Sequence, residues 1–413
     1  MSFYDSLETR DPAEREIYLM NQLPRIVAYA KERAPFYAQF FSGVNPEDIC
    51  SRASLALLPV TRKSDLSEQQ QARPPFGGIC AVPMSSLRRV FCSPGPIYEP
   101  EGGGADPARV ARALYATGLR AGDLLHNCFS YHFTPGAFMF EGGAAKLGCP
   151  VFPGGVGQTE MQVQSMAVLK PVAYVGTPSF LKIILDKAEE MRLDVSSLNK
   201  ALVSGEALPE SLRNALAVKG VYVRQCYATA DLGMIAYESE AKEGLILDEE
   251  LILEIVRPGT GDLVEPGEVG EVLITNFSQE YPLIRFATGD LSAYLPGESP
   301  CGRSNVRIKG WLGRADQTSK VRGMFVHPSQ VASVLKRHPE VNRARLVIDN
   351  ASGQDRMVLH CELVMDVQET DDLRSLLIVS LRDLTKLRAE LAFVLPGTLP
   401  NDGKVIEDIR AYA

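Results

Sequence analysis

The hydrophobic pattern of this chain changes its period along the sequence. Between about residue 106 and residue 226, short apolar runs alternate with segments of helical apolar spacing. The pattern predicts helices at 106–118, 136–147, 158–168, 178–190 and 208–218, and strands at 123–128, 150–152, 172–175, 199–203 and 221–226. Because this alternation is typical of β-α-β units, it predicts an α/β domain with a largely parallel sheet.

The segments on either side of this region have other patterns. Residues 11–32 predict an amphipathic helix, with Asp11 as N-cap and Pro12 at the first helical position. Residues 33–105 are rich in proline and glycine and predict irregular structure. After residue 232, β-like runs at 249–256, 269–276 and 283–294 are separated by Pro-Gly and Gly-Asp turns, which predicts a small β subdomain.

A further pattern begins near residue 314 and predicts an α+β unit. Its strands are expected at 319–326, 343–349, 356–364 and 391–395, and its helices at 328–337, 370–388 and 403–411. We therefore expect an N-terminal domain over residues 1–313 and a C-terminal domain over residues 314–413.

Composition narrows the class of protein. The chain has 413 residues and a net charge of −8, which argues against a nucleic-acid-binding surface. It has no apolar run of about 18 residues, so we expect no membrane span. Its eight cysteines are scattered without a C-x-x-C pair, and its first residues are polar and acidic. These features predict reduced thiols and a cytoplasmic protein without a signal peptide.

Two segments carry candidate chemistry. In YPLIRFATGDLS, an apolar strand runs into Thr-Gly-Asp, and a tight turn at Gly289 would leave the Asp290 carboxylate at the strand end. A carboxylate there can accept both hydroxyl groups of a ribose. In GRADQTSKVRGMFVHPSQV, Arg314 offers a rigid fork of donors, and Asp316 lies where two domains would join. Taken singly, the first segment also fits a plain turn aspartate and the second a plain hairpin followed by a helix.

The two segments together indicate a protein family more specifically than either segment does alone. Thr-Gly-Asp followed 24 residues later by Gly-Arg-x-Asp, and then by Arg-Gly-x-x-x-x-Pro, resembles the adenylate-forming superfamily of acyl-CoA synthetases, adenylation domains and luciferases. PLIRFATGDLS, FPGGVGQTEMQVQ and VGTPSFL further resemble the phenylacetate–coenzyme A ligase branch, and the resemblance covers nearly the whole chain.

The resemblance implies a nucleotide site. Asp290 and Arg314 would hold the ATP ribose, and the segment Ser204-Gly205-Glu206 would line the adenine pocket. The segment Tyr227-Ala228-Thr229-Ala230-Asp231 lies where the family has Tyr-Gly-x-Thr-Glu. Tyr227 would stack on adenine, and Asp231 would bind Mg²⁺. Ala230 stands where the family has a threonine that contacts the α-phosphate, so that contact would be missing.

The resemblance also implies a reaction. Lys404, on a loop expected just before the helix at 403–411, takes the place of the family's catalytic lysine. A mobile ammonium group suits the bridge between the carboxylate and the α-phosphate. The acid would attack ATP to give acyl-AMP, and coenzyme A would then take the acyl group after the C-terminal domain rotates about Asp316.

The phosphate loop departs from the family pattern. The family sequence Ser/Thr-Ser-Gly-Thr-Thr-Gly-Lys-Pro corresponds here to SPGPIYEP at 93–100, which keeps Ser93 and Gly95 as candidate phosphate ligands. Its two inner prolines remove N–H donors, and Glu99 stands in place of the lysine. Two readings remain open: a remodelled loop that uses the glycines at 102–104, or a loss of efficient ATP turnover.

A metal cluster of some relatives is also changed. Glu238, Ile246 and Ser299 stand at positions where those relatives have zinc ligands, and Cys301 alone is kept. Since one thiolate cannot build a tetrahedral site, we expect no zinc.

Two loops are candidates for the acyl pocket. The resemblance points to Tyr131, His132 and Phe133 after one strand, and to Gly154 and Gly155 after the next. The first loop reads equally as an aromatic core loop, and the second as a plain turn. The segments suit a hydrophobic aryl carboxylic acid of the phenylacetate type.

The functional hypothesis is an ATP-dependent acid–coenzyme A ligase with Mg²⁺ as a cofactor, and a homodimer is one candidate assembly. Two alternatives stay open. The first is an adenylating enzyme with another acceptor, such as a carrier protein or a deazaflavin-type cofactor. The second is a catalytically impaired nucleotide- or acyl-binding homologue.

Overall fold

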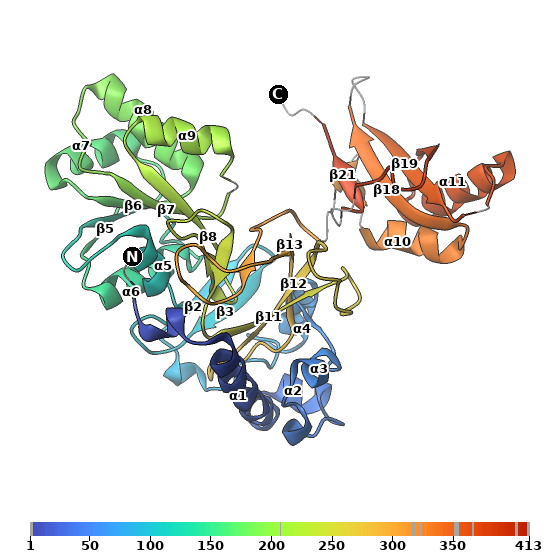
Figure 1. The fold of residues 1–413 in the computed structure, drawn as a ribbon, viewed down its shortest axis with the longest axis horizontal. Helices are drawn as coiled ribbons and strands as arrows, with labels where there is room; N and C mark the ends of the chain where they lie inside the picture. The colour runs from blue at the N-terminus through green and yellow to red at the C-terminus, as the bar shows by residue number, and fades with distance from the viewer. Residues whose placement is uncertain are drawn as a thin grey trace. The chain divides into compact units, whose positions relative to one another are not determined.

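The computed structural model describes residues 3–206, 208–315, 319–321, 324–326, 328–350, 355–365, 367–400 and 404–410. The chain forms two compact units (Figure 1). The first unit comprises Met1–Glu254, Leu273–Thr288 and Tyr294–Trp311, and the second comprises Ile255–Val272, Gly289–Ala293 and Leu312–Ala413.

A nine-stranded sheet forms the centre of the first unit, in the order β14-β15-β10-β9-β8-β7-β6-β4-β5. Its parallel strands are β4 (Leu125–Asn127), β5 (Val151–Pro153), β6 (Ala173–Gly176), β7 (Lys200–Val203) and β8 (Tyr222–Thr229). Antiparallel strands extend it: β9 (Gly233–Tyr237), β10 (Leu245–Leu247), β15 (Arg307–Ile308) and β14 (Tyr294–Leu295).

Helices cover both faces of this sheet (Figure 1). One core cluster joins α5 (Ala111–Thr117) and α6 (Gly136–Leu147) to Ala173 and Val175 of β6. The opposite cluster joins α7 (Thr159–Leu169), α8 (Pro178–Met191) and α9 (Glu210–Val218) to Tyr174. Successive side chains of β6 thus point to opposite faces, as expected for a strand buried on both sides. The predicted α/β class with a parallel sheet is confirmed.

The N-terminal segment is more regular than its composition predicts. Helix α1 (Pro12–Arg33) begins as expected, because the Asp11 carboxylate accepts hydrogen bonds from the N–H groups of Ala13 and Glu14. The prediction of irregular structure for residues 33–105 is wrong in part. The segment holds α2 (Pro35–Phe40), α3 (Arg52–Ala56), β1 (Thr61–Arg62), α4 (Leu66–Ala72) and a hairpin of β2 (Arg89–Ser93) with β3 (Ile97–Glu101). These elements have two to seven residues, too few to establish a period.

The predicted β subdomain is a four-stranded sheet in the order β1-β13-β12-β11. The expected strands are β11 (Leu251–Val256), β12 (Gly270–Asn276) and β13 (Phe286–Ser292). Strand β1 was not anticipated and lies parallel to β13, with Thr61 opposite Phe286. This pairing brings the segment after β1 to the same sheet as the Thr-Gly-Asp motif.

The C-terminal part of the second unit combines two helices with a sheet in the order β20-β19-β18-β21. Its elements are a hairpin of β16 (Ser319–Val321) and β17 (Met324–Val326), then α10 (Pro328–Arg337), β18 (Val341–Asp349), β19 (Arg356–Leu363), α11 (Asp371–Thr385), β20 (Glu390–Val394) and β21 (Ile406–Asp408). The single strand predicted at 319–326 is therefore a hairpin.

The helix predicted at 403–411 is wrong for the described residues 404–410. Strand β21 lies there, parallel to β18, with Ile406 buried. The N–H of Leu346 donates to the Val405 carbonyl, and the N–H of Ile409 donates to the Ile348 carbonyl. Pairing with a distant strand satisfies these backbone groups and overrides the local helical spacing.

No helix among the described residues combines the length and the hydropathy needed to cross a membrane.

Candidate functional site

The loops that follow the parallel strands lie at one edge of the sheet, where open α/β folds bind ligands. The Ser204 hydroxyl donates to the Cys226 carbonyl at 3.0 Å, which joins the ends of β7 and β8. Gly205 has φ +81°, and a Cβ there would lie 3.8 Å from Thr177 and 4.0 Å from Phe129. The predicted adenine-pocket loop therefore packs beside the loops that follow β4 and β6.

Tyr227 connects two of the predicted motifs. It lies two residues before the end of β8, is 8% exposed, and its hydroxyl donates to Thr288 Oγ1 at 3.1 Å. Thr288 is the first residue of Thr-Gly-Asp and is itself buried. The structure thus brings the Tyr-Ala-Thr-Ala-Asp motif against the start of the Thr-Gly-Asp motif.

Asp290 and Arg314 form an ion pair, with Nη1 3.2 Å from Oδ1. A backbone bridge between the same two residues and a hydrogen bond from the Ala315 N–H to the Gly289 carbonyl hold the motifs together. The sequence interpretation placed Asp290 at a strand end, which is wrong: Asp290 lies inside β13 and is 7% exposed. The backbone bridge between Asp290 and Arg314 continues the strand pairing of β13 beyond Gly289.

The backbone conformation at position 289 and the nearby Arg314 side chain both require a glycine there. Its φ is +76°, and a Cβ would lie 2.8 Å from Arg314 Nη2. We expect Gly289→Ala to lose about 1–2 kcal/mol of stability from the left-handed backbone and to raise the KM for ATP by moving the guanidinium. Gly267→Ala is the matched control, because Gly267 has φ +84° and no atom within 4 Å of its Cβ position.

ATP-dependent steady-state kinetics and thermal unfolding of both variants check this prediction. Both should lose similar stability, and only Gly289→Ala should change the KM for ATP. Equal KM values in the two variants would contradict a nucleotide role for Arg314.

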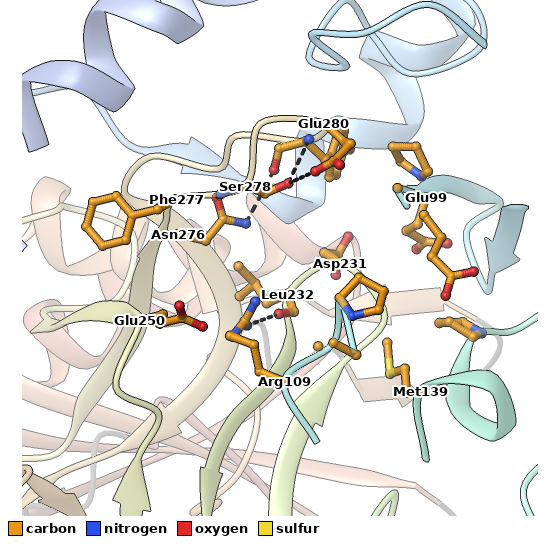
Figure 2. A pocket seen from close by; sticks show the side chains of 18 of the residues that line it. Glu99, Arg109, Met139, Asp231, Leu232, Glu250, Asn276, Phe277, Ser278 and Glu280 are labelled. Carbon is orange, nitrogen blue, oxygen red and sulfur yellow. Dashed lines mark hydrogen bonds between the residues drawn. The ribbon is translucent and has the colours of Figure 1, made fainter. Parts of the chain in front are cut away.

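A cavity of about 470 Å³ lies within the first unit, beside the end of β8 (Figure 2). Asp231 lines it, and its side chain is fully buried. One carboxylate oxygen, Oδ2, lies 2.5 Å from Lys63 Nζ, and the other, Oδ1, has no hydrogen-bond partner among the described residues. A buried carboxylate oxygen without a partner is costly, so this atom suits a bound cation.

Sequence reasoning missed two residues that position this aspartate. Lys63 follows the two-residue strand β1, where no periodic pattern marks it. Arg109 has φ +59° and donates from Nη2 to the carbonyls of Leu232 and Met234, at 2.5 Å and 3.1 Å. Figure 2 shows the hydrogen bond from Arg109 to Leu232 near Asp231. Arg109 therefore fixes the turn that carries Asp231.

Comparison with known proteins identifies relatives of this chain. The family of AMP-binding enzymes matches residues 108–278. A phenylacetate–coenzyme A ligase of Aromatoleum evansii is 32% identical over 378 residues, which cover 86% of this chain and 84% of that protein. One from Thermus thermophilus is 33% identical over 361 residues, covering 83% and 79%.

The chain belongs to the phenylacetate–coenzyme A ligase family. A solved 2-hydroxyisobutyryl-CoA ligase in complex with 2-HIB-AMP and CoA, in its thioesterification state, superposes with a TM-score of 0.72 and 27% identity, covering 98% of this chain and 91% of that one. The predicted enzyme class is confirmed: the chain is an AMP-forming acid–thiol ligase that works through an acyl-adenylate and uses ATP and coenzyme A.

The segment predicted to be the phosphate loop is a tight β-hairpin. Ser93 ends β2, the Gly95–Pro96 peptide forms the turn, and Glu99 lies in β3. The Glu99 carboxylate accepts hydrogen bonds from both the Ser93 hydroxyl and the Ser93 N–H, the latter at 3.2 Å. Burial raises the pKa of Glu99 to about 7, and the Asp231 carboxylate adds to this, while Ser93 and Lys63 act against it. An internal carboxylate thus occupies the backbone and hydroxyl donors of Ser93.

The predicted acyl-pocket residues have unlike surroundings. Tyr131 lies beside Gly155, whose Cβ position is 4.0 Å from the tyrosine ring, and its hydroxyl accepts from Asn127 at 3.1 Å. His132 is exposed and Phe133 is 77% exposed, so they form no core in this structure. A Cβ at Gly154 would lie 2.7 Å from His126 Nε2, which makes this glycine a packing requirement.

The residues that stand at the positions of the relatives' zinc ligands make other contacts in this protein. Glu238 forms a buried bidentate pair with Arg213, with both distances 2.9 Å, and Ile246 is buried in β10. Cys301 contacts the Ser299 hydroxyl at 3.1 Å. No group of three or more potential metal-ligating side chains occurs in the described part of the chain.

The remaining predicted residues are placed as follows. Lys404 is half-buried and lies two residues before the start of β21, so it stands before a strand and not before the expected helix. Glu206 is exposed and accepts a hydrogen bond from the Ser179 N–H at 3.4 Å. Asp316 lies outside the described residues.

Proposed function

We propose that this ligase activates a small hydrophobic acid of the phenylacetate type. Four relatives between 29% and 33% identical over at least 83% of this chain are phenylacetate–coenzyme A ligases, and this observation carries the choice of acid. Tyr131 beside Gly155 offers an aromatic ring and an open glycine backbone to a flat ring.

In this proposal the motif residues hold the nucleotide. Asp290 and Arg314 bind the ribose, and Tyr227 lies against adenine beside the segment Ser204-Gly205-Glu206. Two contacts support this arrangement: the Asp290–Arg314 ion pair and the Tyr227–Thr288 hydrogen bond. The Ala228 and Thr229 backbone would line the same pocket.

Asp231 is the proposed ligand for Mg²⁺. Its unpartnered, buried Oδ1 fits a hard cation, and Lys63 and Arg109 hold the carboxylate in place. When bound, the cation would neutralise phosphate charge.

Lys404 is the proposed catalytic cation. The acid oxygen attacks the α-phosphorus, the bond to pyrophosphate breaks, and the ammonium group stabilises the charge that builds on the transferring group. A C-terminal domain over residues 314–413 would then rotate about Asp316 and withdraw Lys404. The coenzyme A thiol would attack the acyl carbon and release AMP.

A second acid is favoured by one observation. The solved ligase with a TM-score of 0.72 acts on a short hydroxy acid, 2-hydroxyisobutyrate. A short aliphatic acid is therefore the other candidate. A cytoplasmic location and a homodimer remain predictions.

Pyrophosphate release, measured over aryl and short aliphatic acids with and without coenzyme A, tests the proposal. We expect phenylacetate to give the highest rate, with repeated turnover only when coenzyme A is present. Without coenzyme A, release should stop near one equivalent per protein, because acyl-AMP stays bound.

Other outcomes select other functions. Highest activity with 2-hydroxyisobutyrate would support the second acid. A burst of pyrophosphate that coenzyme A does not extend would point to another acceptor. Tight AMP binding without acid-dependent release would indicate an impaired homologue.

A further inference from the structure

One buried glutamine holds the loop between β5 and α7. Gln162 is 3% exposed and is the fourth residue of α7. Its Nε2 donates to the carbonyls of Gly155 and Gly157, at 3.0 and 2.7 Å. Both carbonyls belong to the segment that leads into α7, so a side chain of this helix fixes the backbone of the preceding loop.

The oxygen of the same amide is anchored to β4. His126 Nε2 lies 2.7 Å from Gln162 Oε1, and the Cys128 thiol donates to the same oxygen at 3.0 Å. Because both amide hydrogens serve the loop carbonyls, Oε1 is the acceptor, and His126 Nε2 must carry a hydrogen. His126 is 1% exposed and stacks on Phe152 with the ring centroids 4.9 Å apart, which holds the anchor in place. The amide therefore uses all its donors and acceptor lone pairs.

The glycine loop is tied to Tyr131 through Asn127. The Gly155 N–H donates to the Asn127 carbonyl at 2.9 Å, and the Asn127 side chain donates to the Tyr131 hydroxyl at 3.1 Å. Gly155 has φ +67°, and its Cβ position lies 4.0 Å from the Tyr131 ring. Asn127 thus links the Gly155 N–H to Tyr131, while Gln162 fixes the carbonyl of the same glycine.

The backbone runs directly against the Gln162 amide. A Cβ at Gly154 would lie 2.7 Å from Gln162 Oε1 and 2.7 Å from His126 Nε2. A change at the amide therefore moves the loop backbone, and with it the side of Gly155 that faces Tyr131. Displacements of about 1 Å in a group that positions a substrate can change rates by about 10²-fold.

We propose that Gln162 is a positioning residue that sets the acid selectivity of this ligase by holding the Gly155 backbone beside the Tyr131 ring. This inference rests on the proposed acyl pocket and adds to it a residue that does not touch the acid. A flat aryl acid needs contact with both the tyrosine ring and the glycine backbone, whereas a short aliphatic acid does not span them. A fixed loop therefore favours the aryl acid.

Gln162→Met tests this role, because methionine has a similar size and makes none of the amide hydrogen bonds. Pyrophosphate release gives kcat/KM for phenylacetate and for 2-hydroxyisobutyrate. The ratio of the first to the second should fall about tenfold, through a higher KM for phenylacetate. The KM for ATP should stay within about threefold of wild type, because the amide network lies on the acid side of the site. An unchanged ratio would overturn the inference.

Gln70→Met is the matched control, because it makes the same substitution at another buried glutamine. Gln70 is 5% exposed, donates to the Tyr98 carbonyl at 2.9 Å and accepts from the Tyr98 N–H at 2.8 Å. It thus holds the hairpin of β2 and β3 and not the glycine loop. Both variants should unfold at a lower temperature than wild type, and Gln70→Met should keep the wild-type acid ratio. Equal falls of the ratio in both variants would indicate general loosening and reject the role of Gln162.

Amide hydrogen exchange measures the loop without any reaction. The N–H groups of Gly155 and Gly157 should exchange about tenfold faster in Gln162→Met than in wild type. Gln162→Glu is a second variant for the case that Gln162→Met does not fold. Its carboxyl group keeps an acceptor for His126 and Cys128 and loses the amide donors, so exchange in the loop should rise there too. Wild-type exchange rates in a folded variant would reject the inference.

The two proposals fail separately. Acid-dependent pyrophosphate release with the same acid ratio in wild type and Gln162→Met rejects the role of Gln162 alone. Faster exchange in the loop of Gln162→Met, with no acid-dependent release by wild type, rejects the proposed function alone.

Discussion

Replacing Lys404 with alanine is expected to slow acyl-AMP formation by about two to three orders of magnitude, the usual effect of removing one charge-stabilising donor. The attack on the α-phosphorus builds negative charge that an ammonium group stabilises. Thioester formation from supplied acyl-AMP requires no such charge, so its rate should stay within about threefold of wild type. Pyrophosphate release and thioester formation, measured separately, check this prediction.

Lys336→Ala is the control for Lys404→Ala. Lys336 is exposed in the last turn of α10, in the same unit, and its loss removes the same charge. Both half-reactions should be unaffected. Equal losses of both half-reactions in Lys404→Ala would indicate a structural role, and normal adenylation would remove Lys404 from the mechanism.

Replacing Arg285 with leucine is expected to cost about 3–5 kcal/mol of unfolding free energy, because it strands a buried charge. Arg285 is 2% exposed and its Nη2 lies 3.0 Å from Glu254 Oε1. Its Nη1 also donates to the carbonyls of Ala56 and Leu58, at 2.8 and 2.5 Å. Burial already raises the pKa of Glu254, and Arg285 opposes that rise.

A double variant separates the cost of leaving the Glu254 charge unpaired from the contribution of the ion pair itself. Arg285→Leu with Glu254→Leu removes both charges, so it should recover part of the loss, as buried ion pairs replaced by apolar residues often do. Urea unfolding of the single and double variants measures this recovery. The KM for ATP of the folded single variant should stay within about threefold, because Arg285 does not line the described cavity.

The opposite pattern would reassign Arg285. A loss below about 1 kcal/mol with a large rise in the KM for ATP would make it a nucleotide ligand. The position of Arg285 three residues before Thr288 of the Thr-Gly-Asp motif allows either role in the sequence, and its buried contacts favour the structural one.

The predicted phosphate loop departs from the family pattern in two ways. The sequence showed Glu99 in place of a lysine and two prolines in the loop. The structure adds that the buried Glu99 carboxylate accepts hydrogen bonds from the Ser93 hydroxyl and the Ser93 N–H.

Local pattern alone determined much of this protein. Helical and strand periodicity reports which face of a segment is buried, and so it predicted the parallel sheet and the helices from α5 to α9. The Asp11 cap followed from side-chain chemistry with a fixed local geometry. The family resemblance, and not local pattern, implied that Asp290 and Arg314 act at one site, and the structure pairs them.

The tertiary structure decided the contacts between distant segments. Lys63 reaches Asp231 only because β1 pairs with β13, and β21 replaces an expected helix because β18 offers unpaired backbone groups. The pKa of Glu99 is raised because folding buries its carboxyl group and brings Asp231 near it, while Ser93 and Lys63 oppose part of the rise. Spacing along the chain carries no record of such neighbours, because pairing energy and desolvation depend on which surfaces meet after folding.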